Sequence, residues 1–159
     1  MAAINFSDKV EYYTPKTVFD KFGPFDYDPA TTKETAEKDG IPNYDTVYTD
    51  GLKRNWASFN KIWINPPFTK KFEFLKKAVD TLEDVRGISF YFLLPISALT
   101  TKKFHEIMGD IQYHLFIPDG RIKFESADGG ATSPAFGSVI IFFNGLIDSG
   151  AVKHWRMDG

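Results

Sequence analysis

The stretch of residues 61–95 constrains the fold more than any other part of this sequence. KIWI, at Lys61–Ile64, is a short apolar run that predicts a buried strand stopping at Asn65. Residues 70–84 then carry their apolar side chains at helical spacing. GISFYFLLP, at 87–95, is almost continuously apolar, which is typical of a central strand in a parallel sheet. A strand, a helix and a strand in this order predict an α/β layered domain with a mainly parallel sheet.

The rest of the chain fits the same alternation. We predict a helix with Thr14 as N-cap and Pro15 as its first residue, ending at Gly23-Pro24. The other predicted elements are strands at 25–28, 113–117, 120–124 and 137–143, a loop or weak helix at 29–40, an extended piece at 46–52, a helix at 101–109 and a polar loop at 125–135. The late cluster of strands predicts an antiparallel edge or hairpin.

Length and charge narrow the possible functions. The 159 residues suffice for one domain with a sizeable core, and leave no room for a separate target-recognition domain of usual size. The net charge of -2 excludes a global positive field, so any nucleic acid must meet a local basic patch. The chain has no cysteine, and its three histidines lack metal-like spacing, so we expect no metal site.

We also expect no membrane association. The first residues lack the basic-then-apolar layout of a signal peptide, and no apolar run approaches the length of a spanning helix. A cytosolic protein is the expectation.

Asn65-Pro66-Pro67-Phe68, directly after the strand at Lys61–Ile64, is the most informative motif. In an open α/β sheet, ligands bind beyond the carboxyl ends of the strands, where this motif falls. The prolines fix two φ angles, and Pro66 keeps Asn65 out of the helical region. The result is a stiff loop with an oriented amide, available carbonyl acceptors and an aromatic face.

This loop suits methylation of an exocyclic amine on a base. The side-chain oxygen of Asn65 and the backbone carbonyl of Pro66 would accept from the two N–H groups and turn the nitrogen lone pair out of the ring. Positive charge grows on that nitrogen during attack, so fixed acceptors stabilise the transition state more than the ground state. The base would leave its helix to reach the loop, and Phe68 would stack on it.

Several motifs in order carry a resemblance to a known family. They are YTP at 13–15, DYDPAT at 26–31, DGL at 50–52 with Trp56 downstream, NPPF at 65–68, LLP at 93–95 and GRIKF at 120–124. Together they resemble the small phage-type Dam-like DNA adenine N6 methyltransferases, which depend on S-adenosylmethionine. The resemblance spans roughly residues 12–143.

The resemblance implies a Rossmann-like methyltransferase fold, with a mainly parallel sheet, an antiparallel edge hairpin and helices on both faces. It also implies a bacterial or phage origin, and residue roles. Asn65 to Phe68 would form the catalytic loop. The cofactor, S-adenosylmethionine, would contact Thr14, Pro15, Asp28, Pro29, Ala30, Asp50 and Asn65. Among these, Asp50 would accept from the adenine amine of the cofactor. The chain departs from many methyltransferases in lacking a glycine-rich turn after Asp28.

DNA is the expected partner, and a homodimer is possible. The candidates for phosphate contact are Lys70, Lys71, Arg121 and Lys123. Structural alternatives stay open for single residues: Asp28 could cap the next segment, and Asp50-Gly51 could be a simple turn.

Three functions compete. The first is a DNA adenine N6 methyltransferase. The second is the same loop acting on cytosine N4, where Ser is more usual than Asn65, or on a protein glutamine, whose enzymes usually add an N-terminal domain. The third is a nucleic-acid-binding module without catalysis.

Overall fold

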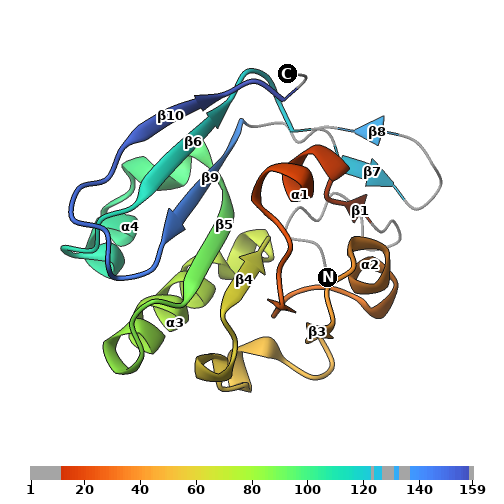
Figure 1. Cartoon of the computed structure of the whole chain (residues 1–159), viewed down its shortest axis with the longest axis horizontal. Coiled ribbons are helices and arrows are strands. Elements are labelled where there is room, and N and C mark those ends of the chain that lie inside the picture. Colours follow the sequence, from red (N-terminus) through yellow and green to blue (C-terminus); the bar gives the residue numbers. More distant parts are fainter. Residues whose placement is uncertain (1–11, 123, 127–130, 133–136, 158–159) are drawn as a thin grey trace.

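A seven-stranded mixed sheet forms the centre of the molecule. The computed structural model describes residues 12–122, 124–126, 131–132 and 137–157 (Figure 1). The strands follow the order β10-β6-β9-β5-β4-β2-β3, and a second, small sheet has the order β1-β7-β8. The strands of the main sheet are β2 (Tyr27–Asp28), β3 (Asn43–Tyr44), β4 (Lys61–Ile64), β5 (Ser89–Pro95), β6 (His114–Pro118), β9 (Ser138–Phe143) and β10 (Val152–Trp155). The small sheet consists of β1 (Tyr12–Tyr13), β7 (Phe124–Ser126) and β8 (Ala131–Thr132).

Six strands of the main sheet point the same way, and β9 runs against them. β9 is antiparallel to both of its neighbours, β5 and β6, while the other neighbouring pairs are parallel. The mainly parallel sheet is therefore confirmed, but the expected antiparallel edge hairpin is wrong, because the reversed strand lies inside the sheet. The burial explains the order: β9 is buried along almost its whole length, whereas β10 exposes three of its four residues and takes the edge.

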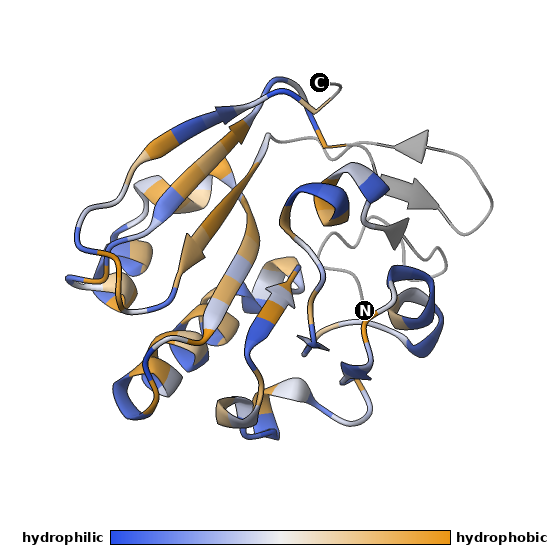
Figure 2. Cartoon of the chain, viewed as in Figure 1, coloured by the Kyte–Doolittle hydropathy of each residue, from blue (hydrophilic) through white to orange (hydrophobic). Residues whose placement is uncertain are grey.

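Helices cover both faces of the sheet, as expected. They are α1 (Lys16–Phe22), α2 (Lys33–Asp39), α3 (Lys71–Asp84) and α4 (Lys102–Met108). One buried cluster unites α3 and α4 with Ile62, Ile64 and the even-numbered residues of β5. The other unites α1 with Trp63, Leu93 and Ile140. Neighbouring residues of one strand thus serve opposite faces, as the pleat requires. Figure 2 shows the hydrophobic colour concentrated on the central strands.

Local chemistry explains where the helices begin and end. α2 begins after Thr32, whose side chain accepts a hydrogen bond from the Thr35 amide, and ends at Gly40 with a positive φ of 72°. α1 begins one residue later than predicted, because Pro15 rather than Thr14 is the N-cap and makes no side-chain cap.

Three further sequence predictions are wrong. Residues 46–52 form a turn and the 3-10 helix Gly51–Lys53 instead of an extended piece, because the Asp50 side chain accepts from the Leu52 amide. The strand predicted at 120–124 is absent from 120–122, and β7 begins at Phe124. The polar loop predicted at 125–135 contains parts of β7 and β8, which pair with each other, and β7 also pairs with β1.

Within the described ranges, no helix has the length and apolar character needed to cross a membrane.

Candidate active site

The carboxyl ends of the parallel strands β2, β3, β4 and β5 meet at one edge of the sheet. Asp28 ends β2, Asp45 follows β3, Asn65 follows β4 and Pro95 ends β5. Three of these four are polar side chains that are almost completely buried. This edge is where open α/β sheets bind their ligands, so it is the candidate active site.

Asn65 holds an unpaired acceptor inside the protein. The residue is only 4% exposed, and its Oδ1 has no hydrogen-bond partner in the described part of the chain. Pro66 behind it is buried, and Pro67 accepts a hydrogen bond from the Lys70 amide at 2.9 Å, which starts a short 3-10 turn. A buried acceptor without a donor costs about 1–3 kcal/mol. The oxygen can therefore accept a hydrogen bond from a donor that is not among the described residues.

Phe68 presents an exposed ring at the end of the same loop. It is 46% exposed, and the Nζ of Lys71 lies 4.0 Å from the ring centroid. The same Nζ donates a hydrogen bond to the Phe68 carbonyl at 3.1 Å, and partial burial lowers the pKa of Lys71. A cation over one face of the ring holds it in place. Lys71 thus contacts both the ring and the carbonyl of Phe68, and its phosphate contact stays a prediction.

Asp28 is buried at the end of β2. Its Oδ1 accepts a hydrogen bond from the Ala30 amide at 3.0 Å. Burial raises the pKa of Asp28 to about 7, although the Ala30 hydrogen bond acts in the opposite direction. A cationic ligand beside this carboxyl would favour its ionised form.

A small cavity lies between the turn after β2 and the loop after β4. Its lining includes three predicted cofactor residues, Pro29, Ala30 and Asp50, together with Pro67 and Lys70. The other lining residues are Thr46, Val47, Gly51, Leu52 and Phe74. The predicted cofactor residues are thus only partly brought together, because Thr14, Pro15, Asp28 and Asn65 do not line this cavity.

Gly51 allows two walls of the cavity to approach each other. A Cβ at this position would lie 2.0 Å from the Pro29 carbonyl oxygen, which no side chain tolerates. The indole N–H of Trp56 donates to the Gly51 carbonyl at 2.8 Å and fixes the turn from the other side. The preceding residue, Asp50, has a positive φ of 57°. Asp50-Gly51 is therefore a turn packed against Pro29 beside the cavity, and the cofactor role of Asp50 stays a prediction.

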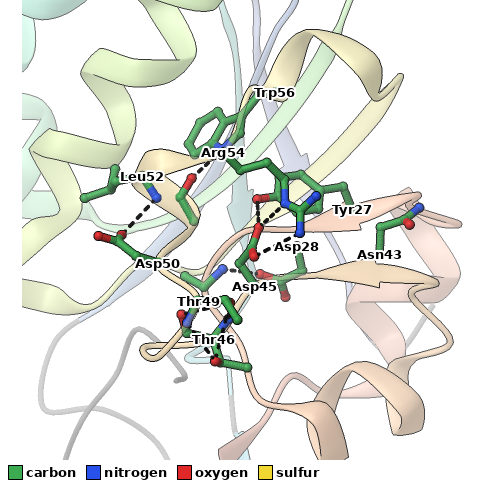
Figure 3. A network of polar contacts seen from close by, with 12 residues as sticks. Tyr27, Asp28, Asn43, Asp45, Thr46, Thr49, Asp50, Leu52, Arg54 and Trp56 are labelled. Atoms are coloured by element: carbon green, nitrogen blue, oxygen red, sulfur yellow. Dashed lines mark hydrogen bonds and ion pairs between the residues drawn. The ribbon is translucent and has the colours of Figure 1, made fainter.

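Asp45 is fully occupied by the protein itself (Figure 3). Its Oδ2 accepts from the Tyr27 hydroxyl and from Arg54 Nε, and its Oδ1 accepts from Arg54 Nη2 at 3.2 Å. Burial acts to raise the pKa of Asp45, but the hydrogen bonds from Arg54 and Tyr27 outweigh it and hold the pKa below its ordinary value. Desolvation and the hydrogen bond to Asp45 raise the pKa of Tyr27. This network joins β2, β3 and the segment before β4.

The remaining predicted residues lie around this edge. Thr14 is buried and Pro15 is half-buried at the start of α1. Arg121 is exposed in the segment after β6, and Lys70 is exposed beside the cavity. Lys123 lies outside the described residues. In the described part of the chain, no three His, Asp or Glu side chains gather as a metal ion would require.

Sequence reasoning missed two features of the site. The pairing of Tyr27 and Arg54 with Asp45 joins residues 18 and nine positions away, and no local pattern signals it. Ser138, at the start of β9, carries a second buried unpaired oxygen. Its position follows only from the reversed direction of β9.

The geometry places the chain in a general class: α/β proteins with a candidate ligand site at the carboxyl edge of the sheet, here with an amide oxygen that has no partner among the described residues. Comparison with known proteins makes this specific. A family model described as "DNA N-6-adenine-methyltransferase (Dam)" matches residues 4–152. The chain belongs to this Dam family.

A curated relative is similar over part of this range. It is the "DNA N-6-adenine-methyltransferase" of Escherichia phage T1, which is 31% identical over 75 residues. The similar stretch covers 47% of this chain and 29% of the phage protein.

Proposed function

We propose that this chain transfers a methyl group from S-adenosylmethionine to the N6 amine of adenine in DNA. The observation that carries the proposal is the unpaired Asn65 Oδ1, buried at the carboxyl edge of the sheet. Membership in the Dam family supports the choice of adenine and DNA. The Asn at position 65 also favours adenine over cytosine as the substrate.

The residues of the site fit the methyl donor. The cavity between Pro29, Asp50 and Pro67 adjoins the catalytic loop and would take the adenosyl end, with Asp50 accepting from its amine. Asp28 would face the positively charged part of the donor, whose presence favours the ionised carboxylate. When bound, S-adenosylmethionine supplies a methyl carbon that is activated by the positive sulfur. Such a site resembles the Rossmann-like methyltransferase arrangement expected from the sequence.

Asn65 and the Pro66 carbonyl orient the amine for attack. They would accept from its two N–H groups, so that the lone pair points away from the base ring. With the amine so oriented, its nitrogen would form the bond to the methyl carbon, and the carbon–sulfur bond would break with its electron pair left on sulfur. The nitrogen then carries the positive charge, which the Asn65 oxygen stabilises, and it finally releases a proton to water. No strong base is required before the transfer.

Phe68 supports the target base. Its exposed ring, braced from one side by Lys71, offers a flat surface on which a flipped adenine would stack. The exposed Lys70 and Arg121 remain candidates for phosphate contacts. The chain would choose its target by loops at the carboxyl edge, as a single domain. A homodimer and a cytosolic location remain predictions.

The test uses the purified chain, DNA and S-adenosylmethionine with a deuterated methyl group, followed by nucleoside digestion and mass analysis. We expect labelled N6-methyladenine. Labelled N4-methylcytosine would overturn the choice of base. DNA without label, under conditions in which S-adenosylhomocysteine raises the melting temperature, would overturn DNA as the substrate. Absence of both label and stabilisation would favour the non-catalytic binding module.

A further inference from the structure

Ser138 carries a buried hydroxyl that the proposed chemistry does not use. The residue is 4% exposed, and its Oγ finds no hydrogen-bond partner in the described part of the chain. Within that part, the one other buried side-chain atom of this kind is Asn65 Oδ1. A buried hydroxyl without a partner destabilises the folded protein. Its presence in a native protein therefore needs an explanation, such as a role in binding.

The strand register puts Ser138 at the same edge of the sheet as Asn65. β9 runs against its neighbours, so its first residue, Ser138, pairs with Pro95, the last residue of β5. Asn65 follows Ile64, the last residue of the adjacent strand β4. Both unpaired atoms therefore belong to the end of the sheet where the ligand is expected.

The two residues also share a face of the sheet. Trp63, Leu93 and Ile140 belong to one buried cluster, the one that includes α1. Asn65 and Ser138 are two positions away from Trp63 and Ile140, so the alternation of the pleat gives them the same face.

The spacing suits a single base between them. The register pairs Ile64 with Phe92, and continuing it by one residue places Asn65 level with Leu93. Ser138 is then two strands across and two residues farther out. With strands ~4.8 Å apart and a rise of ~3.3 Å per residue, the two Cα atoms are about 12 Å apart. Since both side chains project from the same face of the sheet, their oxygens are separated by a similar distance. A hydrogen bond of about 3 Å at each end then leaves roughly 6 Å for the ligand, which is the scale of one base ring.

We propose that Ser138 is a positioning contact for the target adenine: its hydroxyl donates a hydrogen bond to the ring nitrogen N3. The inference rests on the proposed function. With the amine at Asn65, N3 is the acceptor on the opposite side of the six-membered ring, while N1 and N7 flank the amine. Once the base has left the duplex, N3 is free to accept. Two contacts at opposite ends fix the ring in its plane, and Phe68 supports its face.

The experiment compares Ser138→Ala with wild type on oligonucleotides whose target adenine is normal, 3-deaza, 1-deaza or 7-deaza. We expect Ser138→Ala to raise the KM for normal DNA about 3- to 10-fold with little change in kcat. The 3-deaza base should raise the KM of wild type by a similar factor and leave the KM of Ser138→Ala unchanged. The 1-deaza and 7-deaza bases should raise the KM of wild type and of Ser138→Ala by equal factors. Ser97→Ala, an exposed serine just beyond β5, serves as the control and should behave as wild type.

Stability separates this role from a structural one. Removing an unpaired hydroxyl should leave the melting temperature unchanged or raise it. A lowered melting temperature with unchanged KM would overturn the inference, as would a variant as sensitive to 3-deazaadenine as wild type. In both cases a wild type that methylates normal DNA leaves the proposed function intact. A wild type that binds S-adenosylhomocysteine but methylates no adenine would overturn the proposed function, and this inference with it.

Discussion

Asn65 and Asp45 occupy similar places and have opposite surroundings. Each follows a parallel strand at the same edge of the sheet, and each is almost completely buried, at 4% and 2% exposed. Both oxygens of Asp45 accept hydrogen bonds from Tyr27 or Arg54, whereas Asn65 Oδ1 has no partner within the ranges that the structure describes. Position at the ligand edge therefore does not identify a catalytic residue by itself. A group satisfied by its own chain holds the structure, and a group left unpaired is available to a substrate.

The largest expected effect is on catalysis, at Asn65. We expect Asn65→Ala to reduce kcat about 10²- to 10³-fold, because the acceptor for the developing charge is lost. The melting temperature should stay within about 2 °C of wild type, because the Asn65 oxygen has no hydrogen-bond partner among the described residues. Activity assays measure the change in kcat, and thermal unfolding measures the melting temperature. Asn60→Ala, at an exposed position, is the control, and a variant with full activity would exclude the assigned role.

At Asp45 we expect a loss of stability in place of a loss of catalysis. The substitution is made at Arg54, its ion-pair partner. Arg54→Ala leaves the buried Asp45 carboxylate without its cation and should cost about 2–3 kcal/mol of unfolding free energy, below the cost for a fully buried pair because Arg54 is half exposed. Chemical denaturation at pH 7 measures this. The pKa of Asp45 is lowered, so the pair stabilises the protein above the unfolded pKa of about 4 and loses its effect as pH falls below it.

The difference between wild type and Arg54→Ala should accordingly shrink under acid conditions. Arg156→Ala, which removes an exposed arginine, should cost little at any pH. Equal stability of wild type and Arg54→Ala at pH 7 would contradict a structural role for the network.

A stability effect of intermediate size is expected at Asp28. Here the substitution should stabilise the protein at high pH, whereas Arg54→Ala destabilises it. The pKa of Asp28 is raised to about 7, so its contribution to stability is fully present below the unfolded pKa of about 4 and is lost as pH rises through 7. Asp28→Asn keeps an acceptor for the Ala30 amide without the charge. We expect the variant to be more stable than wild type at pH 8, by on the order of 2 kcal/mol, and equal to it at pH 4.

Ligand binding tests the proposed role of Asp28 beside a cation. Calorimetry should show the affinity for S-adenosylmethionine rising between pH 6 and 8 in wild type, with a flatter profile in Asp28→Asn. A stability difference independent of pH would contradict the raised pKa.

The smallest effect is expected at the brace on Phe68. Lys71→Gln removes the cation from the ring, an interaction worth about 0.5–1 kcal/mol at an exposed site. We expect the KM for DNA to rise about 2- to 5-fold and the melting temperature to change little. Lys76→Gln, which loses only an exposed pair with Asp80, is the control. If Lys71→Gln and Lys76→Gln change the KM for DNA equally, Lys71 contributes only its positive charge and does not support the Phe68 ring.

Local patterns predicted what local interactions determine. The bounds of β4 were predicted without error, and those of α3, α4, β5 and β9 to within two residues, since apolar periodicity and Thr or Gly caps act over a few positions. Asn65 was predicted as a site residue because the prolines that orient it are its neighbours. The inner position of β9, the edge strand β10 and the network around Asp45 depend on contacts between distant residues. A single sequence does not display such pairings.

The reversed direction of β9 has a practical consequence. The connection from β6 departs after Pro118 and returns at Ser138, and both points lie at the ligand end of the sheet. Both ends of the connection are therefore fixed by the main sheet. Of its described residues, Ile122 packs in the buried cluster beside α1, whereas β7 and β8 pair with each other and β7 with β1. Exchanging the connection between β6 and β9 among family members should therefore leave the pairing of the core strands unchanged. Such exchanges would test whether this connection influences the DNA sequence that is methylated.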